Sequence, residues 1–352
     1  MLTLSQVTSK TKKLLKILAI IFAIGLVIYM LAKAAPAIKN FISPPAPEKP
    51  NVLYGKLPKI IFPADVTNTE FTYSLNTISG GLPQFPSLIK IYQVNQAAPN
   101  LLALDNAKSS VANAGFTSAP IKINDRQYQW LFPANSSGND MVKIMNMDIF
   151  SSNFDLGSAY SSNQYIASGT NIPTQAQAID IAQGFLDQML LFPSDIDIAK
   201  TATGLFSINN LQLVPATSIS TAQIVRVDFF QKDLDNTPII YSSPFGSSMS
   251  FLVGGGNLQP QVVEAHFYHY YPSKDSATYP LKSSKELFNE LLQGKAHIAA
   301  YDGSLPNVTI TDFYLAYYVD SNHGYFMPVA VFKGSGNFYA YLPAVSDQWA
   351  SN

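Results

Sequence analysis

The sequence predicts an α+β protein in which a single N-terminal transmembrane helix is followed by antiparallel sheets, each covered by a helix. Three observations predict it: an uninterrupted apolar run, two capping boxes that open amphipathic helices, and aromatic segments with period-two alternation that flank glycine-rich turns. The chain of 352 residues is long enough to bury a sizeable core.

The apolar run is ILAIIFAIGLVIYMLA, residues 17–32. With its flanks, the segment 14–38 supplies the roughly 20 apolar residues that cross a bilayer core. Lysines are more numerous before the run than after it: Lys10, Lys12, Lys13 and Lys16 precede it, and Lys33 and Lys39 follow. The positive-inside rule therefore predicts a cytoplasmic tail at 1–13, an extracytoplasmic C-terminal domain and a single-pass protein of the cell membrane, with the lipid bilayer as one partner.

A cleavable signal peptide is the main alternative to this retained signal anchor. Ala32-Lys33-Ala34 resembles a small-x-small cleavage site. The run is longer than the roughly 7–15 apolar residues of a signal peptide, however, and this favours retention. A buried core helix is rarely so apolar on every side.

Changes in composition and turn-forming residues divide the remainder of the chain. A proline-rich linker at 39–51 precedes three expected α+β units at 52–170, 171–275 and 276–352. The formal net charge of −1 argues against nucleic acid as a partner. The sequence has no cysteine, which excludes disulfides, thiolate metal sites and a cysteine nucleophile.

Two helices carry strong start signals. Thr174 with Gln177 and Ser283 with Glu286 match the capping box, and an apolar face follows each box. Pro193 stops the first helix and Gly294 suits the C-terminal cap of the second. A third helix is expected near 98–114, where the apolar pattern is irregular.

The expected strands alternate and are rich in aromatic residues. In 224–231, Val225, Val227 and Phe229 share one face while Arg226 and Asp228 take the other. Glycine-rich turns at 254–257 and 334–337 predict two hairpins. A capped helix followed by a meander thus occurs twice, and a looser version precedes it, with strands near 67–75, 87–94, 119–132 and 141–148.

Catalytic motifs are not found. The sequence has no phosphate-binding loop, no serine-hydrolase elbow and no zinc helix, so we expect no catalytic residue, no cofactor and no metal. His266 and His269 are three apart in a strand and point to opposite faces, whereas Glu264 shares a face with His266. Because carboxylates distant in sequence can converge, a hydrolase stays open as an alternative.

Tyrosines are the most distinctive candidates for a binding surface, since they combine a large area with a polar tip. They are also ordinary strand residues. The candidate partner surface comprises Tyr268, Tyr270, Tyr271, Tyr314, Tyr317 and Tyr318.

The C-terminal part of the chain resembles a known family. The segments HFYHYYP, YPLKSSKELFNELLQGKAHI, ITDFYLAYYV and YFMPVAVFKGSGNFYAYLPAV follow one another. Over 172–345 this order resembles the YycH/YycI group of membrane-anchored extracytoplasmic regulators and, more loosely, PepSY-like α+β modules. The resemblance implies a non-enzymatic protein that contacts a sensor kinase partly through its membrane helix. Small residues of that helix, Ala23, Gly25 and Ala32, would then contact the partner helix.

These observations together predict a membrane-anchored, extracytoplasmic and non-catalytic binding or regulatory module that acts through protein–protein contacts. Its expected partner is another membrane or cell-envelope protein. Two alternatives remain: a cell-envelope hydrolase with a dispersed carboxylate site, and a structural component of cell-envelope assembly. The region 51–165 departs from the family pattern, which leaves a kinase-related role open.

Overall fold

The computed structural model describes residues 21–30, 32–33, 49–132, 141–168, 171–320 and 324–351. The chain divides into two compact units, residues 1–49 and residues 50–352. In the first unit, residues 21–30 and 32–33 are helical. The predicted tail at 1–13 and most of the linker at 39–51 lie outside the described residues.

The predicted membrane topology is corrected by the helices that the structure describes. Among the residues that the structure describes, no helix combines the length and the apolar character required to cross a membrane. The single-pass transmembrane helix at 14–38, the signal anchor and the cell-membrane localisation are therefore wrong as predictions.

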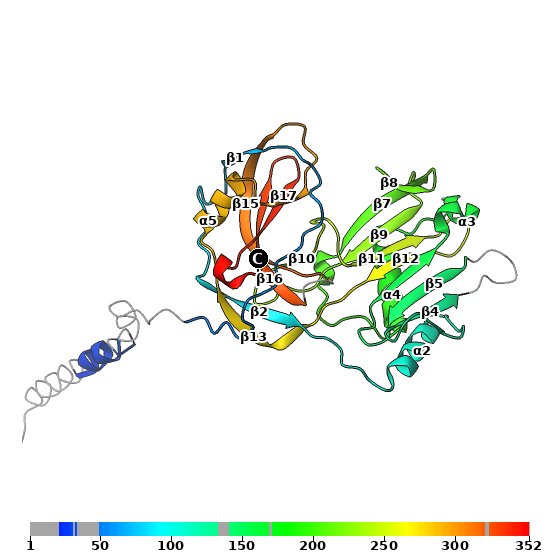
Figure 1. Ribbon diagram of the computed structural model, residues 1–352, viewed down its shortest axis with the longest axis horizontal. Coiled ribbons are helices and arrows are strands. Elements are labelled where there is room, and N and C mark those ends of the chain that lie inside the picture. The colour runs from blue at the N-terminus through cyan, green and yellow to red at the C-terminus, as the bar shows by residue number, and fades with distance from the viewer. Residues whose placement is uncertain are drawn as a thin grey trace, which may run out of the picture. The chain divides into compact units, whose positions relative to one another are not determined.

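The predicted α+β class is also wrong. The body formed by residues 50–352 is mostly β, with two large sheets of nine and eight strands (Figure 1). One of the sheets is not purely antiparallel, because β1 and β10 both run parallel to β15. The class was misjudged because short strands with no clear alternation, such as the two-residue β3 and β10, extend both sheets.

The helices of the body are α2 (Ala103–Asn113), α3 (Gln164–Ala167), α4 (Gln175–Gln188) and α5 (Ser284–Leu292). Its strands are β1 (Thr72–Leu75), β2 (Leu88–Val94), β3 (Ile121–Lys122), β4 (Gln127–Phe132), β5 (Lys143–Asp148), β6 (Phe154–Ser158), β7 (Ala202–Asn209), β8 (Gln212–Pro215), β9 (Ile224–Phe229), β10 (Ile239–Ile240), β11 (Met249–Gly254), β12 (Gln261–Phe267), β13 (Pro272–Pro280), β14 (His297–Ala300), β15 (Asn307–Tyr318), β16 (Tyr325–Gly334) and β17 (Phe338–Pro343).

The nine-stranded sheet has the order β3-β4-β5-β6-β12-β11-β9-β7-β8 and is antiparallel throughout. Helix α4 begins at the predicted capping box, which is confirmed, and it buries Ala178, Ala182 and Leu186 at helical spacing. These side chains join one core with Val225 and Val227 of β9. One face of this sheet is thus packed against α4, and the opposite face carries the polar side chains of Arg226 and Asp228 beside a second apolar cluster that includes Ile224, Leu252 and Val263.

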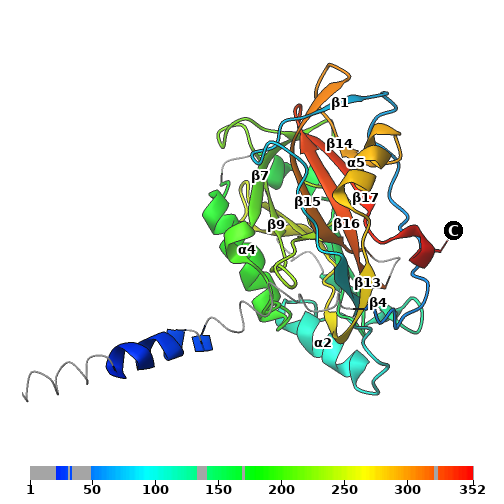
Figure 2. The same ribbon diagram turned by 90° about the vertical axis from the view of Figure 1, so that its left-hand side faces the viewer.

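The eight-stranded sheet has the central order β1-β15-β16-β17-β14, and β2, β10 and β13 join it. Helix α5 begins at the second predicted capping box, also confirmed, and buries Leu287 and Leu291. Both leucines share a core with Phe332 and Phe338. Figure 2 shows α4 beside β9 and α5 beside β14 and β17.

The two sheets do not follow the predicted boundaries at 170 and 275. The chain starts in the eight-stranded sheet with β1 and β2, and then builds β3 to β9 of the nine-stranded sheet. It crosses to β10, returns for β11 and β12, and ends in the eight-stranded sheet from β13 onward. These crossings bring segments far apart in sequence together where the candidate site forms.

Candidate functional site: a polar groove lined from both sheets

Two adjoining cavities lie at the crossings. The serine pocket, of about 370 Å³, is lined by Arg226, Tyr241, Ser242, Ser243, Gly246, Ser247, Ser248 and Val319. The amide cavity, also of about 370 Å³, is lined among others by Asn95, Gln96, Arg126, Asn146, Asp148, Asn153, Asp155 and His269. Both cavities share Tyr268, Tyr270 and Asp320. We call the two together the groove.

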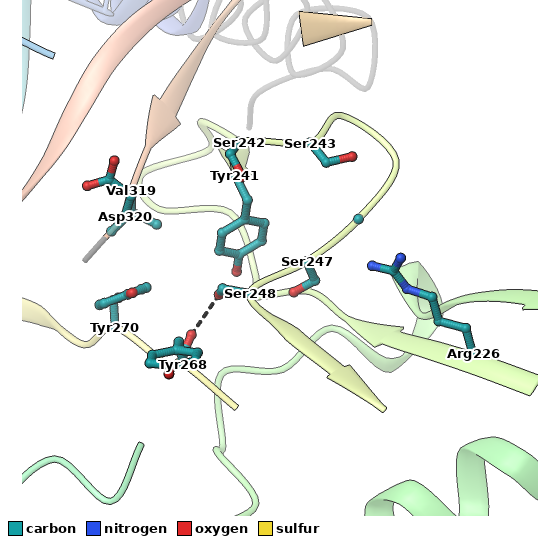
Figure 3. A pocket seen from close by; sticks show the side chains of 11 residues that line it. Arg226, Tyr241, Ser242, Ser243, Ser247, Ser248, Tyr268, Tyr270, Val319 and Asp320 are labelled. Atoms are coloured by element: carbon teal, nitrogen blue, oxygen red, sulfur yellow. Dashed lines mark hydrogen bonds between the residues drawn. The ribbon is translucent and has the colours of Figure 1, made fainter. Parts of the chain in front are cut away.

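Segments from both sheets supply these residues. Asp320 follows β15 of the eight-stranded sheet, whereas Tyr268 follows β12 of the nine-stranded sheet. The loop after β10 is tied to the end of β12 by two hydrogen bonds: Ser248 Oγ donates to the Tyr268 carbonyl at 2.6 Å, and the Tyr268 N–H donates to the Ser248 carbonyl at 2.9 Å. Figure 3 shows the first of these bonds, with Tyr241 between Asp320 and the serines.

Arg226 brings a positive charge to the serine pocket. Its Nη2 lies 2.7 Å from Asp228 Oδ1, and both residues stand on the face of β9 opposite the α4 core. The Asp228 side chain is only 5% exposed, and the N–H of Ser247 donates to the same oxygen at 3.1 Å. Burial raises the pKa of Asp228 and outweighs the lowering effect of Arg226. The carboxylate form of Asp228 is therefore disfavoured relative to that of a solvent-exposed aspartate.

A buried polar network supports the groove from beneath. His269 Nε2 lies 2.7 Å from Asp195 Oδ1. Gln231 Nε2 donates both to Asp195 Oδ2 and to the Tyr270 carbonyl, each at 2.9 Å. The Tyr241 hydroxyl completes the network by donating to Gln231 Oε1 at 3.3 Å. Because these bonds hold the chain around Tyr270, they set the position of an aromatic wall shared by both cavities.

A second charged cluster borders the amide cavity. His266 Nδ1 lies 2.6 Å from Asp155 Oδ1, and Nε2 lies 3.5 Å from Glu264 Oε1. Its bonds to Asp155 and then to Glu264 raise the pKa of His266 to about 9. Burial raises the pKa of Asp155, but the bonds from His266 and Tyr268 outweigh burial and hold it below its usual value. At neutral pH the cluster thus holds an imidazolium between two carboxylates.

The carboxylates that line the groove already have partners. Asp148 accepts from Arg126 Nε at 2.8 Å and from the N–H groups of Phe150 and Ser151. Asp155 is held by His266 and by the Tyr268 hydroxyl. Within the described ranges, no group of three or more His, Asp or Glu side chains is arranged to hold a metal ion. The groove offers hydrogen bonds and aromatic surface in place of an unpaired carboxylate.

The structure separates the six predicted tyrosines. Tyr268 and Tyr270 line the groove, and Tyr271 is exposed with its ring centroid 4.0 Å from that of His269. Tyr317 and Tyr318 are each only 1% exposed and belong to the core of the body. Tyr314 is half-buried on the same strand, β15. Two of the six therefore belong to the candidate site.

The residues predicted to contact a partner helix lie in the first unit. Ala23, Gly25 and Ala32 fall within the helical residues 21–30 and 32–33, and all three are exposed. A Cβ on Gly25 would meet nothing within 4 Å.

Sequence reasoning missed Arg226 and the serine-rich loop. The sequence pattern places Arg226 only on the polar face of a strand, and it gives the 242–248 loop no role beyond the absence of a serine-hydrolase elbow. The available signal was the run SSPFGSS at 242–248, which combines several hydroxyl groups with a turn. No family model, curated protein or solved structure matches the chain. The resemblance to the YycH/YycI group therefore stays a prediction.

Proposed function

We propose that the protein is a non-catalytic binding module whose groove takes an extended peptide segment of a partner protein. One observation carries the proposal: two cavities of about 370 Å³ each adjoin through Tyr268, Tyr270 and Asp320. Each cavity is of the size that ligand sites occupy, roughly 300–1,000 Å³. Because the two cavities share these three residues, the groove extends from the 242–248 loop to Asn95 and Gln96.

The lining suits a peptide backbone. The amide cavity presents side-chain amides from Asn95, Gln96 and Asn146, each with donors and an acceptor that match peptide N–H and C=O groups. Tyr268 and Tyr270 add aromatic surface with polar tips, which is typical of protein interfaces. Polar and aromatic contacts of this kind bind a peptide through its backbone and do not require one particular side chain.

The same geometry disfavours the hydrolase alternative. A glycosidase or a carboxylate protease needs two carboxyl groups that face one substrate and titrate differently. Asp148 and Asp155 are instead committed to Arg126 and to His266 and Tyr268. Both carboxylates are paired with neighbouring side chains, and despite burial the bonds from His266 and Tyr268 hold the pKa of Asp155 below its usual value, which favours binding over proton transfer.

The test is an affinity selection of short random peptides on the full chain, with affinities then measured by calorimetry. Ser243 is exposed at the rim of the serine pocket, so Ser243→Trp fills the pocket without entering the core. We expect selected peptides to bind the native chain and to bind this variant about tenfold or more weakly, a loss that corresponds to about 1.4 kcal/mol.

The matched control is Ser220→Trp, at an exposed position outside both cavities. This variant should bind the selected peptides as the native chain does. Selection of no binding peptide, or equal affinity for the native chain and the Ser243→Trp variant, would refute the proposed function.

A further inference from the structure

A third cavity lies at the eight-stranded sheet and shares no lining residue with the groove. Its volume is about 320 Å³. Four segments line this apolar cavity: residues 57–60, Lys282 before α5, the β16 residues 327–328, and residues 343–351 at and beyond the end of β17. Its volume stands near the lower end of the roughly 300–1,000 Å³ of ligand sites, so it suits one small molecule better than an extended chain.

The lining of the apolar cavity is mainly hydrophobic. Three of its residues are prolines, which have no N–H group and so add no backbone donor to the walls. Four other lining side chains are at most 5% exposed and belong to the core of the eight-stranded sheet: Leu57, Ile60, Met327 and Val345. Such walls favour an apolar ligand, because contact removes the surfaces of both from water.

Hydrogen bonds hold these walls in place. The N–H of Leu57 donates to the Trp349 carbonyl at 2.8 Å, and the Leu57 carbonyl accepts from the N–H of Ser351 at 2.8 Å. The Ser351 hydroxyl donates to the same carbonyl at 2.7 Å. The N–H of Lys282 donates to the Ala344 carbonyl at 2.8 Å. Because the chain itself fixes the walls, binding costs little ordering of the protein.

Two lysines and one aspartate give the lining its charges. Lys282 is 12% exposed and its charge is already matched, since Nζ lies 2.7 Å from Asp347 Oδ1 and 2.9 Å from Oε1 of Glu290, a residue outside the lining. Lys59 is exposed and forms no ion pair with any residue that the structure describes. Its ammonium group is therefore the charge of the lining that a ligand can neutralise.

We propose that the apolar cavity binds a small molecule with an apolar body and a single anionic head group, of the class of a medium-chain fatty acid. The apolar body lies among the buried side chains, and the head group pairs with Lys59 at the exposed rim. A head group placed at Lys282 would instead meet the carboxylate of Asp347, which repels it. This inference is independent of the function proposed for the groove.

The test titrates the full chain with octanoate and with octanol, which share an apolar body and differ in charge. Met327 lines the cavity and is 4% exposed, so its methyl resonance, assigned with Met327→Leu, reports binding there. We expect both compounds to shift this resonance. The resonance of Met249, buried in the core of the nine-stranded sheet, is the internal control and should not move.

Lys59→Met removes the charge and keeps most of the side-chain length. This variant should bind octanoate about threefold to fivefold more weakly, as expected for an ion pair near the surface, and should bind octanol as the native chain does. Lys56→Met is the matched control, because Lys56 is an exposed lysine of the same segment that does not line the cavity. It should leave the affinity for both compounds unchanged.

A Met327 resonance that octanoate does not shift would overturn the inference. Equal affinity of the native chain and Lys59→Met for octanoate would also overturn it, because the head group would then not pair with Lys59. If peptides selected for the groove shift this resonance and octanoate does not, the cavity belongs to a protein partner and the inference fails while the groove stands.

Discussion

His269 Nε2 lies 2.7 Å from Asp195 Oδ1, although 74 residues separate the two. The histidine side chain is 2% exposed and follows β12, whereas Asp195 follows α4. Asp195 also accepts from Gln231, which in turn holds the Tyr270 carbonyl. The carboxylate of Asp195 therefore joins three segments beneath the groove.

Replacement of Asp195 by alanine should destabilise the body. The change leaves Nε2 of His269 without its acceptor and Nε2 of Gln231 with the Tyr270 carbonyl alone, and an unpaired buried group costs about 1–3 kcal/mol. We expect the free energy of unfolding in urea to fall by about 2–4 kcal/mol. Asp197→Ala is the control, because Asp197 caps one N–H, that of Ala199, and should cost about 1 kcal/mol. Equal losses in the two variants would contradict the role given to Asp195.

The same carboxylate predicts sensitivity to acid. Burial raises the pKa of Asp195, but the bonds from His269 and Gln231 outweigh burial and hold its pKa below the usual value. A lowered pKa in the folded state gives stability that is present above the unfolded value of about 3.9 and is lost as the pH falls through the folded value. Urea unfolding at pH 7 and pH 3 should show a smaller loss in Asp195→Asn than in the native chain; parallel losses would argue against the linkage.

His266 should titrate far above an ordinary histidine. Its partners Asp155 and Glu264 raise its pKa to about 9. The stability that this pair contributes is complete below the unfolded value of about 6.5 and is lost as the pH rises through about 9. An NMR titration of the ring protons should place the midpoint near 9, and Asp155→Asn should move it down. A native midpoint close to 6.5 would refute the assigned geometry.

Local chemistry made part of the fold predictable. Thr174 with Gln177 and Ser283 with Glu286 form the predicted capping boxes, because each box satisfies backbone donors within four residues. The turn at 334–337 joins β16 to β17 as expected, with Asn337 at a φ of 47°. Such signals are read from neighbours in sequence and need no knowledge of the tertiary fold.

The groove could not be predicted from residues that are neighbours in the sequence. Arg226, Ser243, Tyr268 and Asp320 come from four separate segments, and only the crossings between the two sheets bring them together. The strand expected over 119–132 illustrates a smaller error: Asn124 Oδ1 accepts from the N–H groups of Arg126 and Gln127 and turns the chain between β3 and β4. An asparagine that opens such a turn is a local signal that the sequence contains.

Gly256 is expected to be the least replaceable glycine of the turn between β11 and β12. Its φ is +59°, and a Cβ there would lie 1.7 Å from the Tyr165 carbonyl oxygen in α3. That oxygen accepts from the N–H of Asn257 at 2.7 Å, so the turn cannot move away without losing this bond. Gly256→Ala should therefore cost about 3 kcal/mol or more in urea unfolding, the sum of backbone strain and a steric clash.

Gly80→Ala separates the two contributions. Gly80 has a φ of +72°, but a Cβ there meets nothing within 4 Å, so only the strain of about 1–2 kcal/mol applies. The difference between the two variants measures how firmly the turn is packed against α3. A cost at Gly256 no larger than that at Gly80 would mean that the turn yields, and that the contact between Tyr165 and Asn257 does not hold this end of the nine-stranded sheet.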